Sequence, residues 1–163
     1  MPLTIEVASG PMLEGWRAIH NAIIPTHPLS ADDVAERATR HRLTVARAGG
    51  ALVGNATLRP PRSPDQVATV IVRILPAYRR NGHGTEYLQA ELARARADGA
   101  ERIETVVLVS HEAGLAFAHR HGFVEHDRYL LDGDLVPYAD LHLPAGADTG
   151  ADGGADSEAG LSR

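Results

Sequence analysis

The sequence predicts an α/β protein of the α+β type, with a mixed, mostly antiparallel central sheet of about seven strands and helices on both faces. Residues 43–48 and 51–58 are largely apolar and are joined by Gly49-Gly50, a pair typical of a hairpin turn. Further along the chain, predicted strands alternate with predicted helices, which favours crossover connections. Early hairpins followed by later crossovers indicate a mixed sheet rather than an all-parallel one.

The length of the chain supports one domain. A chain of 163 residues can bury one core but not comfortably two, so we expect residues 1–143 to form a single domain. Residues 144–163 are mostly Ala, Gly, Asp and Ser. We expect this tail to be disordered, because it cannot bury enough apolar surface to offset the entropy of ordering it.

The first part of the chain predicts one strand and two helices. Residues 3–8 alternate apolar and polar, which is typical of a half-buried strand. The apolar side chains of residues 13–23 recur at helical spacing, and we expect Trp16 to lie in the core. Ser30, with Asp33 three positions later, predicts an N-cap and an acidic capping box at the start of the second helix.

The second part predicts strands that alternate with helices. Three prolines between Arg59 and Asp65 predict a loop, and the apolar run that follows predicts a strand buried on both faces. Gly99 should end the next helix as a left-handed cap. Ser110 should cap the last helix, whose inner face we assign to Ala113, Ala116 and Phe117. The remaining strands are expected at residues 102–109, 123–131 and 136–143.

Composition excludes several classes of function. The net charge is −5, so the balance does not favour binding to nucleic acid. The sequence has no cysteine, which excludes disulfides, thiolate metal sites and a cysteine nucleophile. No apolar run approaches the length of a membrane span, and the N-terminus lacks the pattern of a signal peptide. A cytoplasmic protein is therefore expected.

One stretch carries a strong chemical signal, the turn that joins the buried strand to the next helix. The strand at residues 67–75 is followed by Pro76, which has no N–H to donate to a ladder. The turn then contains Arg79, Arg80 and the glycines Gly82 and Gly84. Glycine lets main chain approach a ligand closely, and a helix N-terminus offers N–H groups to anions. This pattern predicts an anion cradle, most plausibly for a pyrophosphate.

The same stretch resembles the acyl-CoA loop of the GCN5-related N-acetyltransferases, the GNAT family. The resemblance rests on Arg79-x-x-Gly82-x-Gly84 after a strand that ends in Ile74-Leu75-Pro76, and on the pair Gly122-Phe123 after a later helix. It covers roughly residues 3–143. It implies a GNAT-like acyl-CoA N-acyltransferase fold and an enzyme that uses acetyl-CoA as co-substrate without a metal. The acetyl group would pass to a primary amine by direct attack in a ternary complex.

The resemblance also implies roles for individual residues. The main chain of Arg73, Ile74 and Leu75 would pair with the pantetheine arm, and an N–H of this strand would bind the thioester oxygen. The residues implied to hold the pyrophosphate are Arg79, Arg80, Asn81, Gly82, His83, Gly84 and Thr85.

The proton-transfer groups depart from the family pattern. The family often has an Asn at the start of the penultimate helix and a Tyr seven positions later, but His111 and Ala118 stand at those positions. The frequent glutamate base also has no counterpart. His111 and Tyr129 are therefore the candidate catalytic residues, His111 because its ordinary pKa of about 6.5 suits proton transfer.

Several alternatives stay open at this point. A non-catalytic acyl-CoA-binding sensor competes with the enzyme, whereas a nucleotide binder of another fold is disfavoured because no P-loop is present. His20 and Asn21 either line the acceptor site or simply pack. His119 and His121 are two apart on a helix, so they do not predict a metal site. The expected partners are acetyl-CoA and an unidentified amine, with neither nucleic acid nor membrane. A homodimer is open, with the final strand available for pairing.

Overall fold

The computed structural model describes residues 2–144. The chain divides into two compact units, Met1–Ile103 and Glu104–Arg163. The tail predicted to be disordered lies outside the described residues from residue 145 onward.

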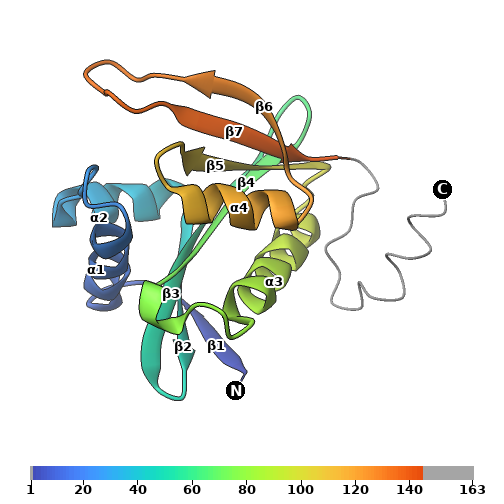
Figure 1. Ribbon diagram of the computed structural model, residues 1–163. Helices are drawn as coiled ribbons and strands as arrows, with labels where there is room; N and C mark the ends of the chain where they lie inside the picture. The colour runs from blue at the N-terminus through green and yellow to red at the C-terminus, as the bar shows by residue number, and fades with distance from the viewer. Residues whose placement is uncertain (1, 145–163) are drawn as a thin grey trace. The chain divides into compact units, whose positions relative to one another are not determined.

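The first unit is an antiparallel sheet with helices on both faces (Figure 1). Its strands pair in chain order, each antiparallel to the next. The strands are β1 (Leu3–Val7), β2 (Arg42–Ala48), β3 (Ala51–Arg62) and β4 (Val67–Ile74). The helices are α1 (Met12–Ile23), α2 (Ala31–Arg40), the short 3-10 helix η1 (Pro76–Tyr78) and α3 (His83–Ala97).

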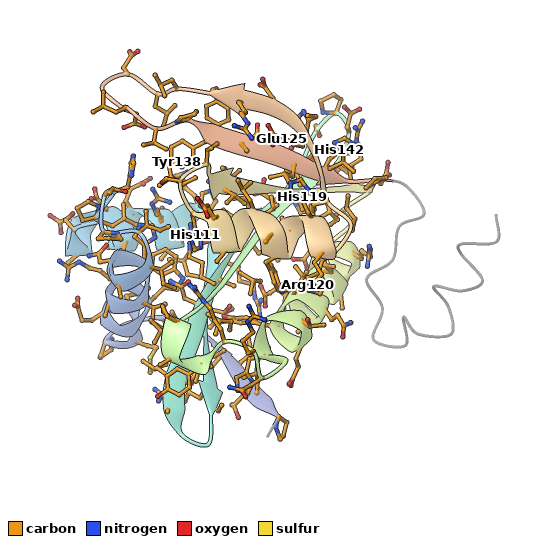
Figure 2. All side chains as sticks on the ribbon, in the orientation of Figure 1. His111, His119, Arg120, Glu125, Tyr138 and His142 are labelled. Atoms are coloured by element: carbon orange, nitrogen blue, oxygen red, sulfur yellow. The ribbon has the colours of Figure 1, made fainter. Side chains whose placement is uncertain are left out.

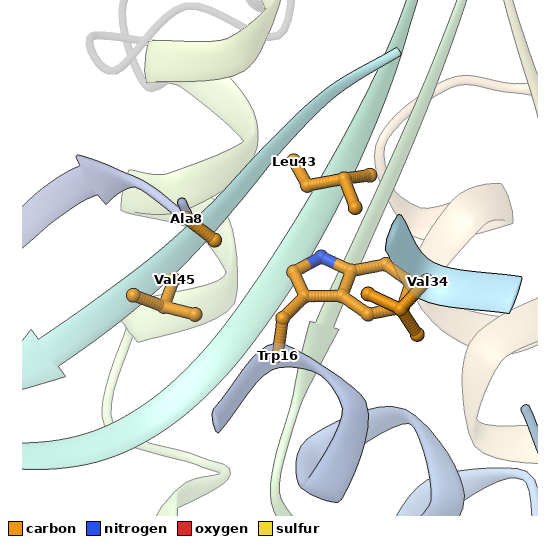
Figure 3. Packing of buried hydrophobic residues seen from close by; sticks show 5 residues of the cluster. All are labelled: Ala8, Trp16, Val34, Leu43 and Val45. Carbon is orange, nitrogen blue, oxygen red and sulfur yellow. The ribbon is translucent and has the colours of Figure 1, made fainter. Parts of the chain in front are cut away.

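Trp16 is the centre of the core that α1 and α2 form against the sheet. Its side chain is fully buried, as the sequence predicted, and packs with Val34 of α2 and Leu43 of β2 (Figure 3). The indole N–H donates to the carbonyl of Ala56 at 3.0 Å, so its one polar atom is satisfied. This contact fixes α1 on the middle of the sheet.

The opposite face of the sheet packs against α3. Ala46 and Val53 point to this side, where Tyr87 of α3 is fully buried. The Tyr87 hydroxyl and the Thr44 hydroxyl lie 2.6 Å apart, so the phenol has a partner inside the core. Alternation along β2 and β3 supplies both cores from the same strands.

The capping box predicted for α2 is confirmed. The Ser30 hydroxyl accepts from the Asp33 N–H at 3.0 Å, and the Asp33 carboxylate accepts from the Ser30 N–H at 2.9 Å. The predicted left-handed conformation of Gly99 after α3 is also found, with φ 102°. These local signals act within a few residues, so the sequence alone suffices to read them.

The loop predicted from Arg59 to Asp65 is wrong in its first half, and only the residues after Arg62 form the turn to β4. Strand β3 continues to Arg62, and its pairing with β4 shifts register between Arg59 and Arg62. Pro60 and Pro61 lie within that irregularity, where a residue without an N–H removes no regular ladder bond. Proline therefore marks a bulge here rather than the end of the strand.

The second unit contains most of β5 (Arg102–Leu108), then α4 (Glu112–Arg120), β6 (Val124–Tyr129) and β7 (Tyr138–Leu143). The strand order is β5-β7-β6, so the final strand has a neighbour on each side. The final strand therefore has no free edge for the pairing with a second subunit that the sequence left open. Gly122 has φ 92° and Phe123 is buried, which places the Gly-Phe pair at the end of α4.

Two expectations for α4 are also corrected. Its N-cap is His111 rather than Ser110, and no side chain caps the helix. Ala118 is buried, whereas Ala113 and Ala116 are exposed. Ala118, rather than Ala113 or Ala116, therefore lies on the buried side of this helix.

Gly54 of β3 lies very close to the main chain of β4. It pairs with Ile74, and a Cβ atom at this position would overlap the carbonyl oxygen of Arg73 and lie 2.8 Å from Ile74 Cδ1. A carbonyl of a paired strand cannot move aside as a side-chain tip can. The alignment of β3 with the end of β4 therefore requires glycine here.

Glu91 of α3 is a buried carboxyl group that the sequence analysis did not single out. It is 1% exposed, its Oε2 lies 3.4 Å from Arg42 Nη1, and its Oε1 has no hydrogen-bond partner among the described residues. Burial raises its pKa above the ordinary 4.5, and Arg42 opposes this shift. The folded state therefore binds this proton more tightly than the unfolded chain does.

We expect Glu91→Gln to change how stability depends on pH. The folded state holds this proton more tightly than the unfolded state, so the parent should lose stability as the pH rises above about 4.5, and the variant should not share that loss. Melts between about pH 5 and 8 should show the variant's Tm gaining on the parent's. A constant Tm difference, or one that shifts toward the parent, would contradict the assignment.

We expect Gly54→Ala to lower the free energy of unfolding by about 1–3 kcal/mol, because the new methyl group overlaps main chain. Gly15→Ala in α1 is the matched control. Its Cβ would meet Leu52 Cδ1 at 3.1 Å, a flexible tip, and alanine favours a helix by about 1 kcal/mol over glycine. Urea titrations of both variants are the measurement, and equal losses would refute the role of Gly54.

Candidate functional site

The turn singled out by the sequence begins where β4 leaves the sheet. The Leu75 N–H still donates to Val53 O at 2.8 Å, and Pro76 then starts η1. Tyr78 N–H donates to Leu75 O at 2.9 Å, so the chain folds back at once. Pro76 thus ends the ladder as predicted, because it has no N–H to continue it.

The register of β4 decides which main-chain groups face outward. Leu75 bonds to β3, and antiparallel strands alternate, so Arg73 also turns its N–H and C=O toward β3. The N–H and C=O of Ile74 point away from β3. The Arg79 side chain agrees with this, since its Nε donates to Ile74 O at 2.8 Å. Of the residues proposed to pair with pantetheine, Ile74 is the one with outward-facing amide groups.

Arg79 is therefore tied to the end of β4. Its Nε is committed to the Ile74 carbonyl, and burial lowers the pKa of its guanidinium. The neighbouring Arg80 is exposed and has φ 69°, a left-handed conformation that is unusual for a residue with a side chain. Arg80 is consequently the better placed of the two to meet an anion from solvent.

Helix α3 starts from the glycine turn. Gly82 is its N-cap with φ 80°, and the first helical bond runs from the Glu86 N–H to Gly82 O at 3.1 Å. The main-chain N–H groups of His83 and Gly84 stand ahead of that bond, at the positive end of the helix. The His83 side chain is buried, so its main chain alone is available to a ligand. Arg79 to Thr85 thus lie together where the chain turns from the end of β4 into α3, and we call this turn the corner.

The side chain of Asn81 fastens this corner. Its Nδ2 lies 3.3 Å from Tyr78 O and 3.4 Å from Arg79 O. These bonds tie the turn between η1 and α3 back to the end of η1. The arrangement can bind an anion through main-chain N–H groups, with the cation of Arg80 at its edge.

The two candidate catalytic residues lie in the second unit. His111 is at the start of α4, and Figure 2 shows it at that end of the helix. A Cβ on Gly114 would lie 3.0 Å from His111 Nε2, so the absence of a side chain at Gly114 makes room for the ring. The ring is thereby held over the first turn of α4.

Tyr129 is engaged within its own hairpin. It stacks on Tyr138 with ring centroids 5.9 Å apart. Burial raises the pKa of Asp140, and a hydrogen bond from Tyr129 lowers it. The phenol proton of Tyr129 is therefore directed at a carboxylate, which weakens the case for Tyr129 as the acid that protonates a thiolate.

Other histidines do not form a metal centre. His121 packs on Phe117 at 4.5 Å, and the rings of His126 and His142 lie 5.1 Å apart. Within residues 2–144 there is no cluster of three or more potential His, Cys, Asp or Glu ligands. In the same residues no helix is long and apolar enough to cross a membrane.

From the sequence, His20 and Asn21 could either line the acceptor site or simply pack. The structure gives the two residues different surroundings. Asn21 is a loop anchor, because its amide bonds to both the N–H and the C=O of Leu29 at 2.9 and 3.1 Å. His20 uses one nitrogen in a similar way, with Nε2 3.1 Å from His27 O, and its other nitrogen is buried. Asn55 was not among the residues predicted from the sequence, although a Gly-Asn pair inside an apolar strand is an available signal.

Comparison with known proteins agrees with this geometry. The model of the Acetyltransferase (GNAT) family matches residues 12–123. A mycothiol acetyltransferase from Stackebrandtia nassauensis is 33% identical over 118 residues, which cover 67% of this chain and 38% of that protein. The chain therefore spans well under half the length of this relative.

Solved structures share the fold at lower identity. Ard1 from Thermoplasma volcanium matches with a TM-score of 0.74 and 17% identity, over 87% of this chain and 97% of that chain. A spermidine N-acetyltransferase from Vibrio cholerae, solved with CoA and spermine, matches with a TM-score of 0.70 and 18% identity, over 86% and 94%. The GNAT-like fold class predicted from the sequence is confirmed, and the chain belongs to the GNAT acetyltransferase family.

Proposed function

We propose that the chain is an acetyl-CoA-dependent N-acetyltransferase that acetylates a primary amine by direct attack in a ternary complex. The observation that carries the proposal is the corner where β4 ends and α3 begins. There the outward amide of Ile74 and the first N–H groups of α3 follow one another along eleven residues of chain, Ile74 to Gly84. Such a corner suits a ligand with a carbonyl at one end and phosphates at the other.

The donor half of the reaction follows from main-chain groups. The pyrophosphate would lie against the N–H groups of His83 and Gly84, with Arg80 nearby. The thioester oxygen would accept from the Ile74 N–H, which would stabilise the negative charge that develops as the amine attacks. In that step a C–N bond forms and the C–S bond breaks, with CoA leaving as a thiolate.

Two protons must move in this reaction, one from the amine and one to the thiolate. We favour His111 over Tyr129 as the donor to the thiolate, because the Tyr129 hydroxyl already bonds to Asp140. The enzyme's main contribution is to position the two reactants.

A non-catalytic acyl-CoA sensor is the second candidate. The observation that favours it is the buried Ala118 on α4, where family members often carry a tyrosine. A sensor would bind CoA through the same corner without turning it over, so activity separates the two readings.

We expect the protein to release free thiol from acetyl-CoA when it is mixed with a panel of small amines and peptides. Acetylation of the protein's own side chains adds little to the background, because the sequence contains no lysine. Thiol release that depends on an amine supports the enzyme. Tight CoA binding without release above background for any amine would favour the sensor instead.

We expect Gly82→Ala to raise the Kd for CoA about tenfold, since holding a residue with a Cβ at φ 80° costs roughly 1–2 kcal/mol. Gly99→Ala is the matched control. It also has positive φ, at the other end of α3, and neither Cβ would meet an atom within 4 Å. Both variants should lose similar stability, but calorimetry should show weaker CoA binding only for Gly82→Ala. Equal effects of the two substitutions on CoA binding would contradict the assignment of residues 79–85 to CoA binding.

A further inference from the structure

A set of polar side chains gathers where α1 meets β3 and β4. Asn55 of β3 and Arg73 of β4 are direct partners across the ladder, so they share one face of the sheet. The Asn55 amide donates to the Trp16 carbonyl at 3.0 Å, which shows that this face is the one covered by α1. Arg73 directly precedes Ile74, so these side chains lie beside the proposed thioester contact.

His20 joins this set from the last turn of α1. It stacks on Trp16 with ring centroids 5.6 Å apart, and the charge of Arg73 acts on it. A carbonyl only accepts hydrogen bonds, so the contact with His27 O at 3.1 Å assigns the ring proton to Nε2. Nδ1 therefore presents a lone pair.

That lone pair is buried and unused. His20 is 7% exposed, and Nδ1 has no hydrogen-bond partner among the described residues. Asn55 is fully buried and repeats the pattern, because its NH₂ is used and its Oδ1 lacks a partner in the same part of the chain. Two buried acceptors without a donor are costly, and they call for a ligand or water that brings N–H or O–H groups.

The charges around His20 favour an uncharged ligand. Burial first, and then Arg73, lower the pKa of His20 to about 4, although the hydrogen bond to the His27 carbonyl raises it, and Arg37 of α2 lowers it further. The imidazole is therefore neutral at physiological pH. The cations of Arg73 and Arg37 disfavour an ammonium ion at this position and tolerate an uncharged amine.

We propose that Nδ1 of His20 accepts a hydrogen bond from the N–H of the acceptor amine and so aims the amine lone pair at the thioester carbonyl. The inference rests on the proposed function and assigns its acceptor as an amine that enters uncharged. His20 does not keep the proton that the amine loses after the C–N bond forms, and that proton passes to water.

A pair of substitutions separates this role from anchoring of the 24–30 loop. His20→Asn keeps an acceptor close to the Nδ1 position but loses the Nε2 donor, whereas His20→Gln keeps a donor that can reach His27 O but loses Nδ1. We expect His20→Gln to lower kcat about 10- to 100-fold with unchanged CoA affinity, and His20→Asn to retain more activity. The reverse order, or equal kcat for both variants, overturns the proposal.

Asn21→Ala is the matched control, because it loosens the same loop without touching Nδ1. Its kcat should stay near that of the parent. A loss as large as that of His20→Gln would assign the effect to the loop and overturn the proposal. In the parent, the rise of kcat/KM with pH should follow the pKa of the amine used, and a shared inflection near pH 6.5 for amines of different pKa would also overturn it.

An NMR experiment tests the contact without turnover. In protein labelled with ¹⁵N-histidine and saturated with CoA, the Nδ1 signal of His20 should move when the best amine of the panel is added, or ethylamine where none is turned over. If the signal moves in a protein that releases no thiol, the proposed acetyltransferase activity is contradicted, but the proposed amine contact of His20 is supported. An unmoved signal in an active enzyme would show a structural water only and overturn the proposal.

Discussion

The close approach of Gly54 to the Arg73 carbonyl is the constraint on which the candidate site depends. It fixes the alignment of β3 with the end of β4, and that alignment decides that the amide of Ile74 faces outward while those of Arg73 and Leu75 face β3. A shift by one residue would turn the wrong amide outward and send Arg73 to the opposite face. One small residue thus sets both the main-chain donor and the side chains around it.

The parts of the fold that could be predicted depend on local physics. The capping box at Ser30, the cap at Gly99 and the core position of Trp16 follow from a few neighbouring residues. Pro60 and Pro61 predicted a loop where the strand in fact continues. A bulge tolerates both prolines, and whether a bulge forms depends on the partner strand. Glu91 was missed because a carboxyl on a helix is normally exposed, and here α3 buries it against Arg42.

The same division applies to the candidate site. Glycine and proline mark the turn from β4 to α3, so Arg79 to Thr85 could be located from the sequence. The functions of individual side chains could not, because they depend on register and tautomer. Arg79 bonds back to Ile74, and Tyr129 bonds to Asp140, although both were expected to act on the ligand. No sequence pattern predicts which ring nitrogen of His20 has no hydrogen-bond partner among the described residues.

This difference explains why family membership defines the donor better than the acceptor. Main-chain groups hold the donor in this proposal, and they require a conformation rather than particular side chains, so a few glycines and one proline preserve the signal at low identity. Side chains must hold the acceptor, and side chains such as His20 and Asn55 belong to no spaced motif. In our proposal the acceptor is selected by the buried atoms of His20 and Asn55 that lack a partner in the described part of the chain and by the charges on the α1 face of the sheet, which would favour an uncharged amine.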